Sequence, residues 1–223
     1  MTELWHGVIR LRLDMINNTG DISQFFDFFK ERNVKSILDI GANVGNFSMM
    51  MRHIMPDVYL HMIEANPFCD GILKKTQIPY SIACLSNEEK DVQFYFQDGN
   101  MIGTGSSYYL ENTNYFSMKN YSWFTTQTLD SVLERDCPDI VFDFIKMDTQ
   151  GSELDIMRGG QKTISNARYV LLEISLIPYN IGAPLKEEVM EYMKSIGFVP
   201  IQKIDESYMD GTLIQEDWIF ERT

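Results

Sequence analysis

Short runs of apolar residues alternate with amphipathic stretches along this chain. Mostly apolar runs predict buried strands over residues 36–40, 58–63 and 80–85. Between them, helices are predicted from Asn46 to about Ile54 and from Asn66-Pro67 onward, where Asn66 serves as the cap and Pro67 as the first helical residue. Strands that alternate with helices indicate right-handed βαβ units and a parallel sheet with helices on both faces.

The same alternation continues toward the end of the chain. Further strands are expected at 92–96, 139–147, 169–174, 198–204 and 217–221. A helical turn over 153–157 and a helix over 185–196, ended by Gly197, fall between them. Before the first strand, a helix is predicted over 21–32 with Asp21 as its cap, because Ile22, Phe25, Phe26 and Phe29 recur at helical spacing.

Residues 98–124 form a long polar and aromatic segment that predicts a loop, and loops of this length commonly serve as lids or substrate loops. Aromatic faces beside hydroxyl and amide groups suit a sugar-like ligand, and they equally suit a packed lid or a dimer surface. Stacking on single-stranded nucleic acid is disfavoured because Lys119 is the sole basic residue in this stretch. With 223 residues and no linker, we expect residues 1–33 to form an N-terminal helical extension and 34–223 one catalytic domain.

The net charge bears on the binding partners, and the cysteines and the N-terminal residues bear on the cellular compartment. The formal net charge of -13 argues against a nucleic acid or an anionic membrane as the partner. Cys69, Cys84 and Cys137 form no CxxC pair, which fits a reducing compartment and no structural zinc. The N-terminal residues lack the apolar region of a signal peptide, and no apolar run approaches the ~20 residues of a membrane span. We expect a cytoplasmic protein that acts on a small molecule and that can form a homo-oligomer.

A glycine-containing turn and an acidic strand end predict a nucleoside site. The turn Asp39-Ile-Gly-Ala-Asn-Val-Gly45 follows the first strand, at the edge of the sheet where ligands bind. Glu64 ends the second strand, where a carboxylate accepts hydrogen bonds from the two ribose hydroxyls. Asn43 replaces the middle glycine of GxGxxG, and Asp39 would repel a pyrophosphate but hold an amino group. These two features favour S-adenosylmethionine over NAD.

Several segments resemble the FkbM-type methyltransferases. They are Leu38–Phe47, Ile63–Asn66, Leu172–Ser175, Trp218–Phe220 and, most specifically, Lys146-Met-Asp-Thr-Gln-Gly-Ser-Glu153, which is similar to a K-x-D-x-[EQ]-G-x-E signature. The resemblance implies a Rossmann-like class I methyltransferase fold with a mostly parallel seven-stranded sheet. It also implies S-adenosylmethionine as cofactor and O-methylation of sugars, glycans or polyketide products.

The resemblance also assigns roles to individual residues. It places Asp39, Gly41, Asn43 and Gly45 in the cofactor turn and Glu64 at the ribose. It places Ala83 and Ser86 near the adenine, and it puts Asp148 at the reaction centre beside the cofactor.

An alcohol acceptor needs a base that removes its proton as the methyl group is transferred. Histidines occur only at positions 6, 53 and 61, so we expect either a carboxylate as the base or a reaction that uses no strong base. Asp148 is the first candidate, with a turn or cap residue as its alternative. Glu153 is either catalytic or a helix N-terminal carboxylate, and Glu173 is either a substrate contact or the partner of Lys146.

Asp39, Asp148 and Glu173 could alternatively bind a divalent metal, but their spacing matches no metal motif, so no metal is expected. The sequence thus predicts an S-adenosylmethionine-dependent O-methyltransferase. The alternatives are an NAD-dependent oxidoreductase and a nucleoside-binding module without turnover.

Overall fold

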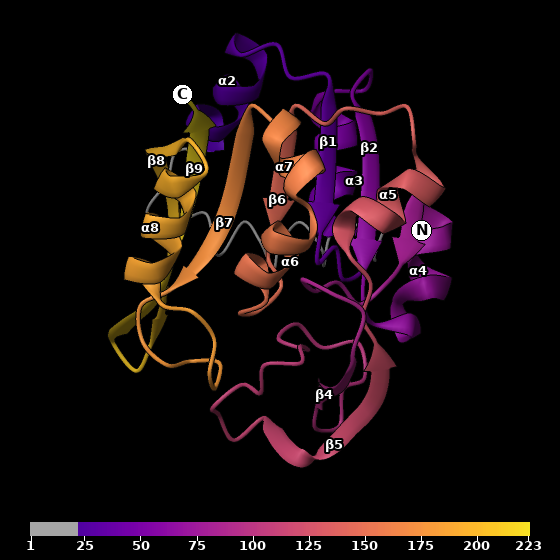
Figure 1. Cartoon of the computed structure of the whole chain (residues 1–223), viewed down its shortest axis with the longest axis vertical. Helices are drawn as coiled ribbons and strands as arrows, with labels where there is room; N and C mark the ends of the chain where they lie inside the picture. Colours follow the sequence, from indigo (N-terminus) through magenta and orange to yellow (C-terminus); the bar gives the residue numbers. More distant parts are fainter. Residues whose placement is uncertain (1–21) are drawn as a thin grey trace.

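A seven-stranded sheet forms the centre of the computed structural model, which describes residues 22–223 (Figure 1). Its strands follow the order β3-β2-β1-β6-β7-β9-β8. They are β1 (Ser36–Ile40), β2 (Tyr59–Glu64), β3 (Tyr80–Ile82), β6 (Phe144–Met147), β7 (Tyr169–Ser175), β8 (Phe198–Met209) and β9 (Thr212–Arg222). All neighbours pair in parallel except β9, which runs antiparallel to both β7 and β8. The mostly parallel seven-stranded sheet is therefore confirmed, and its strand order reverses direction between β1 and β6, where ligands bind in such sheets.

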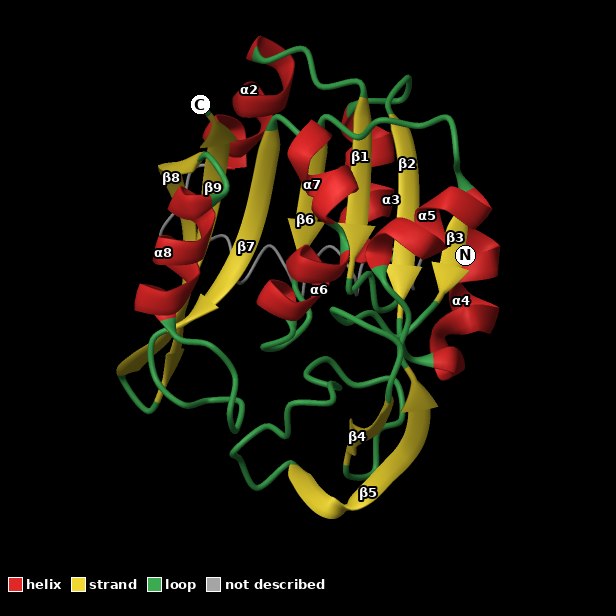
Figure 2. Ribbon diagram, viewed as in Figure 1, coloured by secondary structure: helices red, strands yellow, loops and turns green. Residues whose placement is uncertain are grey.

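Helices cover both faces of this sheet (Figure 2). One face carries α2 (Ile22–Glu31), α3 (Asn46–Ile54), the short 3₁₀ helix η1 (Pro67–Cys69) and α4 (Asp70–Thr76). The other carries α5 (Leu129–Asp136), α6 (Glu153–Gly159), α7 (Gln161–Asn166) and α8 (Lys186–Ser195). Because side chains alternate along a strand, Ile37 packs with the first layer and Leu38 and Ile40 with the second. Both faces of the central parallel strands β1, β2, β6 and β7 are thus buried, as their apolar sequences require.

Helix α2 is held to the sheet by aromatic contacts. Phe28 and Phe29 are buried, and their ring centroids lie 6.0 Å and 4.7 Å from that of Phe144. The helix predicted over residues 21–32 is confirmed from Ile22 to Glu31. Asp21, its expected cap, and the side chains of Phe25 and Phe26 lie outside the described part of the chain.

A separate two-stranded sheet lies beyond the carboxyl ends of the parallel strands (Figure 1). It pairs β4 (Asp91–Gln97) with β5 (Phe116–Thr125) in antiparallel register. The prediction of a loop over 98–124 was therefore wrong from Phe116 onward. Phe94 and Phe124 stack against each other with ring centroids 4.8 Å apart, and this packing holds β5 to β4 although most of β5 is exposed. The connection over residues 98–115, called the lid loop below, remains without helix or strand.

Element bounds differ from expectation at several other places. The strand predicted over 139–147 begins only at Phe144, where pairing with β1 starts, and the strand predicted over 80–85 ends at Ile82. Helices α5 and α7 were not predicted, while β8 and β9 are longer than expected. Among residues 22–223, no helix is long and apolar enough to cross a membrane.

Candidate active site

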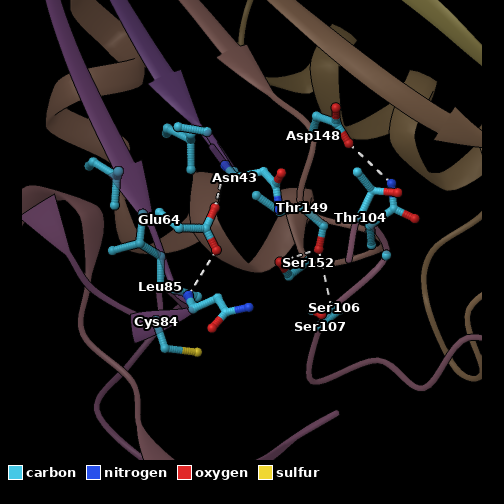
Figure 3. Close-up of a pocket in the computed structure, with 18 of the residues that line it drawn as sticks. Asn43, Glu64, Cys84, Leu85, Thr104, Ser106, Ser107, Asp148, Thr149 and Ser152 are labelled. Atoms are coloured by element: carbon cyan, nitrogen blue, oxygen red, sulfur yellow. Dashed lines mark hydrogen bonds between the residues drawn. The ribbon is translucent and has the colours of Figure 1, made fainter. Parts of the chain in front are cut away.

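A cavity of about 370 Å³ opens at the carboxyl ends of β1, β2 and β6, and the lid loop closes one side of it (Figure 3). This volume lies within the usual range for small-molecule sites. Its lining includes five residues predicted for the cofactor or the chemistry: Gly41, Asn43, Glu64, Ala83 and Asp148. Segments far apart in the sequence therefore meet around one hollow.

The turn after β1 has a backbone that glycine makes possible. Gly41 has a φ of 75°, and a Cβ placed on it would lie 1.9 Å from the carbonyl oxygen of Asp148. Asn43 follows with a φ of 51°, a left-handed conformation that Asn tolerates better than most residues. Gly45, at φ 83°, caps α3, where a Cβ would press on Met62 and Leu73. Gly45 therefore shapes the turn from behind, whereas Gly41 and Asn43 lie on the cavity wall.

Glu64 is held at the floor of the cavity by two backbone amides. Its Oε2 accepts a hydrogen bond from the Asn43 amide at 2.6 Å, and its Oε1 accepts one from the Asn66 amide at 2.8 Å. Burial raises the pKa of Glu64, and the two amide hydrogen bonds offset part of that effect. Each carboxylate oxygen keeps a further lone pair toward the cavity, so Glu64 can also accept hydroxyl protons.

One end of the cavity is apolar. Ala65, Ala83, Cys84, Leu85 and Phe94 line it and present a surface that suits a planar base. Ser86, which was predicted beside Ala83, is fully buried behind this wall, where its hydroxyl donates to the Asn87 side chain. The structure thus places Ala83 at the cavity but not Ser86.

Lys146 joins two carboxylates at the opposite end. Its Nζ lies 3.3 Å from Asp39 Oδ1 and 3.3 Å from Asp148 Oδ2. Asp39 is completely buried and also accepts a hydrogen bond from the Ser48 hydroxyl at 2.7 Å. Asp39 therefore lies behind the cavity wall as the buried partner of Lys146, whereas Lys146 and Asp148 face the cavity.

Glu173 has partners other than the one the sequence suggested. Its Oε2 accepts hydrogen bonds from the Gln150 and Gln215 side-chain amides, at 2.6 Å and 2.8 Å. Lys146, its predicted partner, forms its ion pairs with Asp39 and Asp148 instead. Gln150 also donates to Asp148 Oδ1 at 3.1 Å and so connects the two carboxyl groups.

Glu153 stabilises the turn that follows β6. Its Oε1 accepts hydrogen bonds from the Thr149 amide at 2.8 Å and the Thr149 hydroxyl at 3.0 Å. It is 7% exposed and opens α6 outside the cavity lining, as the helix N-terminal alternative expects. Among the three carboxylates proposed for catalysis, only Asp148 lines the cavity.

The lid loop contributes residues from the aromatic and hydroxyl-rich segment that the sequence indicated as a lid or a ligand surface. Gly103 to Tyr108 line the cavity, and the side chains of Asn43 and Asn66 donate to the carbonyl oxygens of Ile102 and Met101. The hydroxyls of Tyr108 and Tyr109 both donate to Asp155 Oδ2 on α6, at 3.2 Å and 3.0 Å. The composition of the segment indicated its use, whereas the partner of each residue depends on contacts with distant segments that the sequence does not show.

The three cysteines are free and buried. In the described part of the chain, no group of three or more His, Cys, Asp or Glu side chains is arranged to hold a metal ion.

Comparison with known proteins adds a family and a fold. A family model described as "Methyltransferase FkbM domain" matches residues 39–200. A search of curated proteins gives no match. Among solved structures, magnesium protoporphyrin IX methyltransferase from Synechocystis PCC 6803 with bound S-adenosylmethionine is similar, with a TM-score of 0.51, 9% identity, and coverage of 91% of this chain and 78% of that chain. An uncharacterised protein from Listeria monocytogenes has a TM-score of 0.50, 11% identity, and coverage of 85% and 62%, respectively. At these identities the structural matches support the fold alone.

Proposed function

Since this chain belongs to the FkbM methyltransferase family, we propose that it transfers a methyl group from S-adenosylmethionine to a hydroxyl of a sugar, a glycan or a polyketide-like small molecule. Family membership makes the protein a methyltransferase that uses S-adenosylmethionine, rather than an oxidoreductase that uses NAD. The hydroxyl acceptor and the roles of individual residues are the parts that we propose.

The cavity residues fit this cofactor. Asn46 lines the cavity, and its buried Oδ1 has no hydrogen-bond partner among the described residues. A buried acceptor of this kind favours a ligand that brings a donor, such as the α-ammonium group of S-adenosylmethionine. Glu64 would accept the ribose hydroxyls, and the apolar wall around Ala83 and Cys84 would contact the adenine. We place the acceptor at the opposite end, near Asp148.

The position of Asp148 on the cavity wall is the observation that carries the proposal. Its side chain is 31% exposed, so the carboxylate is open to a ligand while Lys146 holds it. Of the two histidines within residues 22–223, His61 on β2 is buried against Ser81 of β3, and His53 lies outside the cavity lining. A carboxylate is therefore the available base, as the sequence suggested.

When bound, S-adenosylmethionine would supply the electrophilic methyl group, and its sulfur would keep the electron pair of the carbon–sulfur bond that is lost. Asp148 accepts the proton that the hydroxyl loses as the new carbon–oxygen bond forms. Lys146 and Gln150 hold Asp148 in position, and the lid loop excludes water from the cavity.

The direct test is transfer of an isotope-labelled methyl group from S-adenosylmethionine to a panel of sugar, glycan and polyketide hydroxyls. Asp148→Asn should lower turnover by a factor of about 100 or more, while affinity for S-adenosylhomocysteine stays within about twofold. Asp57→Asn is the matched control, because Asp57 is exposed before β2. Turnover of the Asp148 variant at the wild-type rate would remove Asp148 as the base, and label found only on nitrogen or carbon would overturn the hydroxyl acceptor.

A further inference from the structure

One side-chain amide lies between two carboxyl groups at the acceptor end of the cavity. Gln150 Nε2 is 3.1 Å from Asp148 Oδ1 and 2.6 Å from Glu173 Oε2. An amide nitrogen carries two hydrogens, so both contacts can be made at once with one hydrogen each. Gln150 also lines the cavity, whereas Gln215, the second amide on Glu173, lies outside its lining.

The backbone conformation of Gln150 places its side chain between the two carboxyl groups. Its φ is 56°, a left-handed conformation that is uncommon for a residue other than glycine and is kept where surrounding contacts require it. The next residue, Gly151, has a φ of 101°, and a Cβ on it would lie 2.5 Å from that of Ala183 in the loop after β7. The turn is thus held between the ends of β6 and β7. The side-chain amide of Gln150 contacts Asp148, which follows β6, and Glu173 on β7.

Glu173 serves as the fixed end of this bridge. Burial raises the pKa of Glu173 well above its ordinary value, and the neighbouring carboxylates Asp148, Asp217 and Glu153 raise it further. Burial and these neighbouring carboxylates therefore favour the protonated form of Glu173, whose Oε2 accepts from both glutamine amides. The Gln150 amide thus lies between the carboxyl group of Glu173 and that of Asp148.

We propose that Gln150 is a positioning residue, which fixes the Asp148 carboxylate toward the acceptor by donating one amide hydrogen to Glu173 and the other to Asp148. This inference rests on the proposed role of Asp148 as the base. Lys146 contacts Oδ2 and Gln150 donates to Oδ1, so the carboxylate cannot turn away from the cavity without losing both contacts. Loss of the Gln150 donor should make Asp148 easier to protonate, because a hydrogen bond to the charged form stabilises that form.

Several charged groups surround Asp148, and each belongs to an identified element. Lys146 on β6 contacts it directly, and Asp39 on β1 is the other partner of that lysine. Glu153 on α6 and Glu173 on β7 are close enough to interact electrostatically, and Asp217 on β9 acts on Glu173. Substitution of Gln150 by a neutral residue leaves all of these charges in place.

The test follows the side-chain carboxyl signal of Asp148 by ¹³C NMR across pH in the protein saturated with S-adenosylhomocysteine. Gln150→Met, which keeps the length but removes the donor, should raise the midpoint by about one pH unit. Gln215→Met is the matched control: it removes the other amide from Glu173, and the Asp148 midpoint should not move. An unchanged midpoint in Gln150→Met, or an equal rise in Gln215→Met, would overturn the inference.

Substitutions of Glu173 test the bridge from its other end, and they also serve if Gln150→Met does not fold. Glu173→Gln keeps an acceptor oxygen and should titrate like the wild type, whereas Glu173→Leu should raise the Asp148 midpoint as Gln150→Met does. Equal midpoints in these two variants would overturn the bridge. The titration needs no methyl acceptor, so an empty acceptor screen would count against the proposed function without affecting this result.

Discussion

At the residue scale, Lys146 balances a carboxylate that has no contact with solvent. Asp39 is 0% exposed, and Lys146 lies 3.3 Å from its Oδ1. Lys146→Met should therefore leave a buried charge without its counterion and reduce the free energy of unfolding by about 3–5 kcal/mol. Denaturant unfolding measures this loss. The double variant Lys146→Met with Asp39→Asn should recover part of the stability, and no recovery would contradict the pairing argument.

Glu64 provides a second prediction at this scale, on affinity rather than stability. Glu64→Ala removes the acceptor of the Asn43 and Asn66 amides as well as the proposed ribose contact. Affinity for S-adenosylhomocysteine should fall by about tenfold or more, because hydrogen bonds to a charged group contribute roughly 1.5–3 kcal/mol. Calorimetric titration measures the change, and unchanged affinity would rule out Glu64 as the ribose contact.

At the scale of elements, the lid loop is attached to α6 through two tyrosine hydroxyls that share Asp155. Replacing both Tyr108 and Tyr109 by Phe removes these hydrogen bonds and leaves α6 unchanged. Dissociation of S-adenosylhomocysteine should become about tenfold faster, since two hydrogen bonds that hold the loop closed are lost. Stopped-flow fluorescence measures the rate, with Tyr121→Phe on the exposed face of β5 as control. A rate equal to that of the control would show that the loop does not gate the cavity.

The same scale shows what local sequence can predict. Strand β1 has the bounds that the sequence predicted, because a glycine-containing turn follows its five buried residues directly. The turn residues and Glu64 were predicted because their roles follow from strand ends. Strand β5 was missed because it shows no clear alternation of apolar and polar residues and its partner β4 lies on the far side of a long loop. The separate positions of Asp39 and Asp148 on either side of Lys146 depend on parallel register between β1 and β6, which no local pattern shows.

At the scale of the whole molecule, acidic groups set how stability depends on pH. Burial raises the pKa of Glu64, Glu153 and Glu173 above that of an unfolded chain, so the folded form binds their protons more tightly. Their contribution to stability is complete below the ordinary value of 4.5 and is lost as pH rises through the folded-state pKa. Asp136 acts in the opposite direction, because its hydrogen bond from Arg135 lowers its pKa to about 2. Its contribution is lost only in strong acid.

The melting temperature without ligand should therefore rise as the pH falls from neutral toward 4.5, and relief of repulsion within a chain of net charge -13 adds to the rise. Below pH 6.5, His61 counteracts this rise in melting temperature, because burial lowers the pKa of its imidazole. Glu173→Gln, which is neutral at every pH, should make the dependence shallower. Differential scanning calorimetry measures both curves, and a wild-type melting temperature that falls over this interval would contradict the assignment of the buried carboxyls.

The central claim is that the cavity beneath the lid loop binds S-adenosylmethionine and its product. The most direct measurement is the thermal shift of the wild-type protein with S-adenosylhomocysteine, with NAD in parallel. A ligand at about 100 times its dissociation constant stabilises by about 2.7 kcal/mol, so S-adenosylhomocysteine should raise the melting temperature by roughly 5–10 °C and NAD should leave it unchanged. A shift with NAD alone, or with neither ligand, would contradict the account.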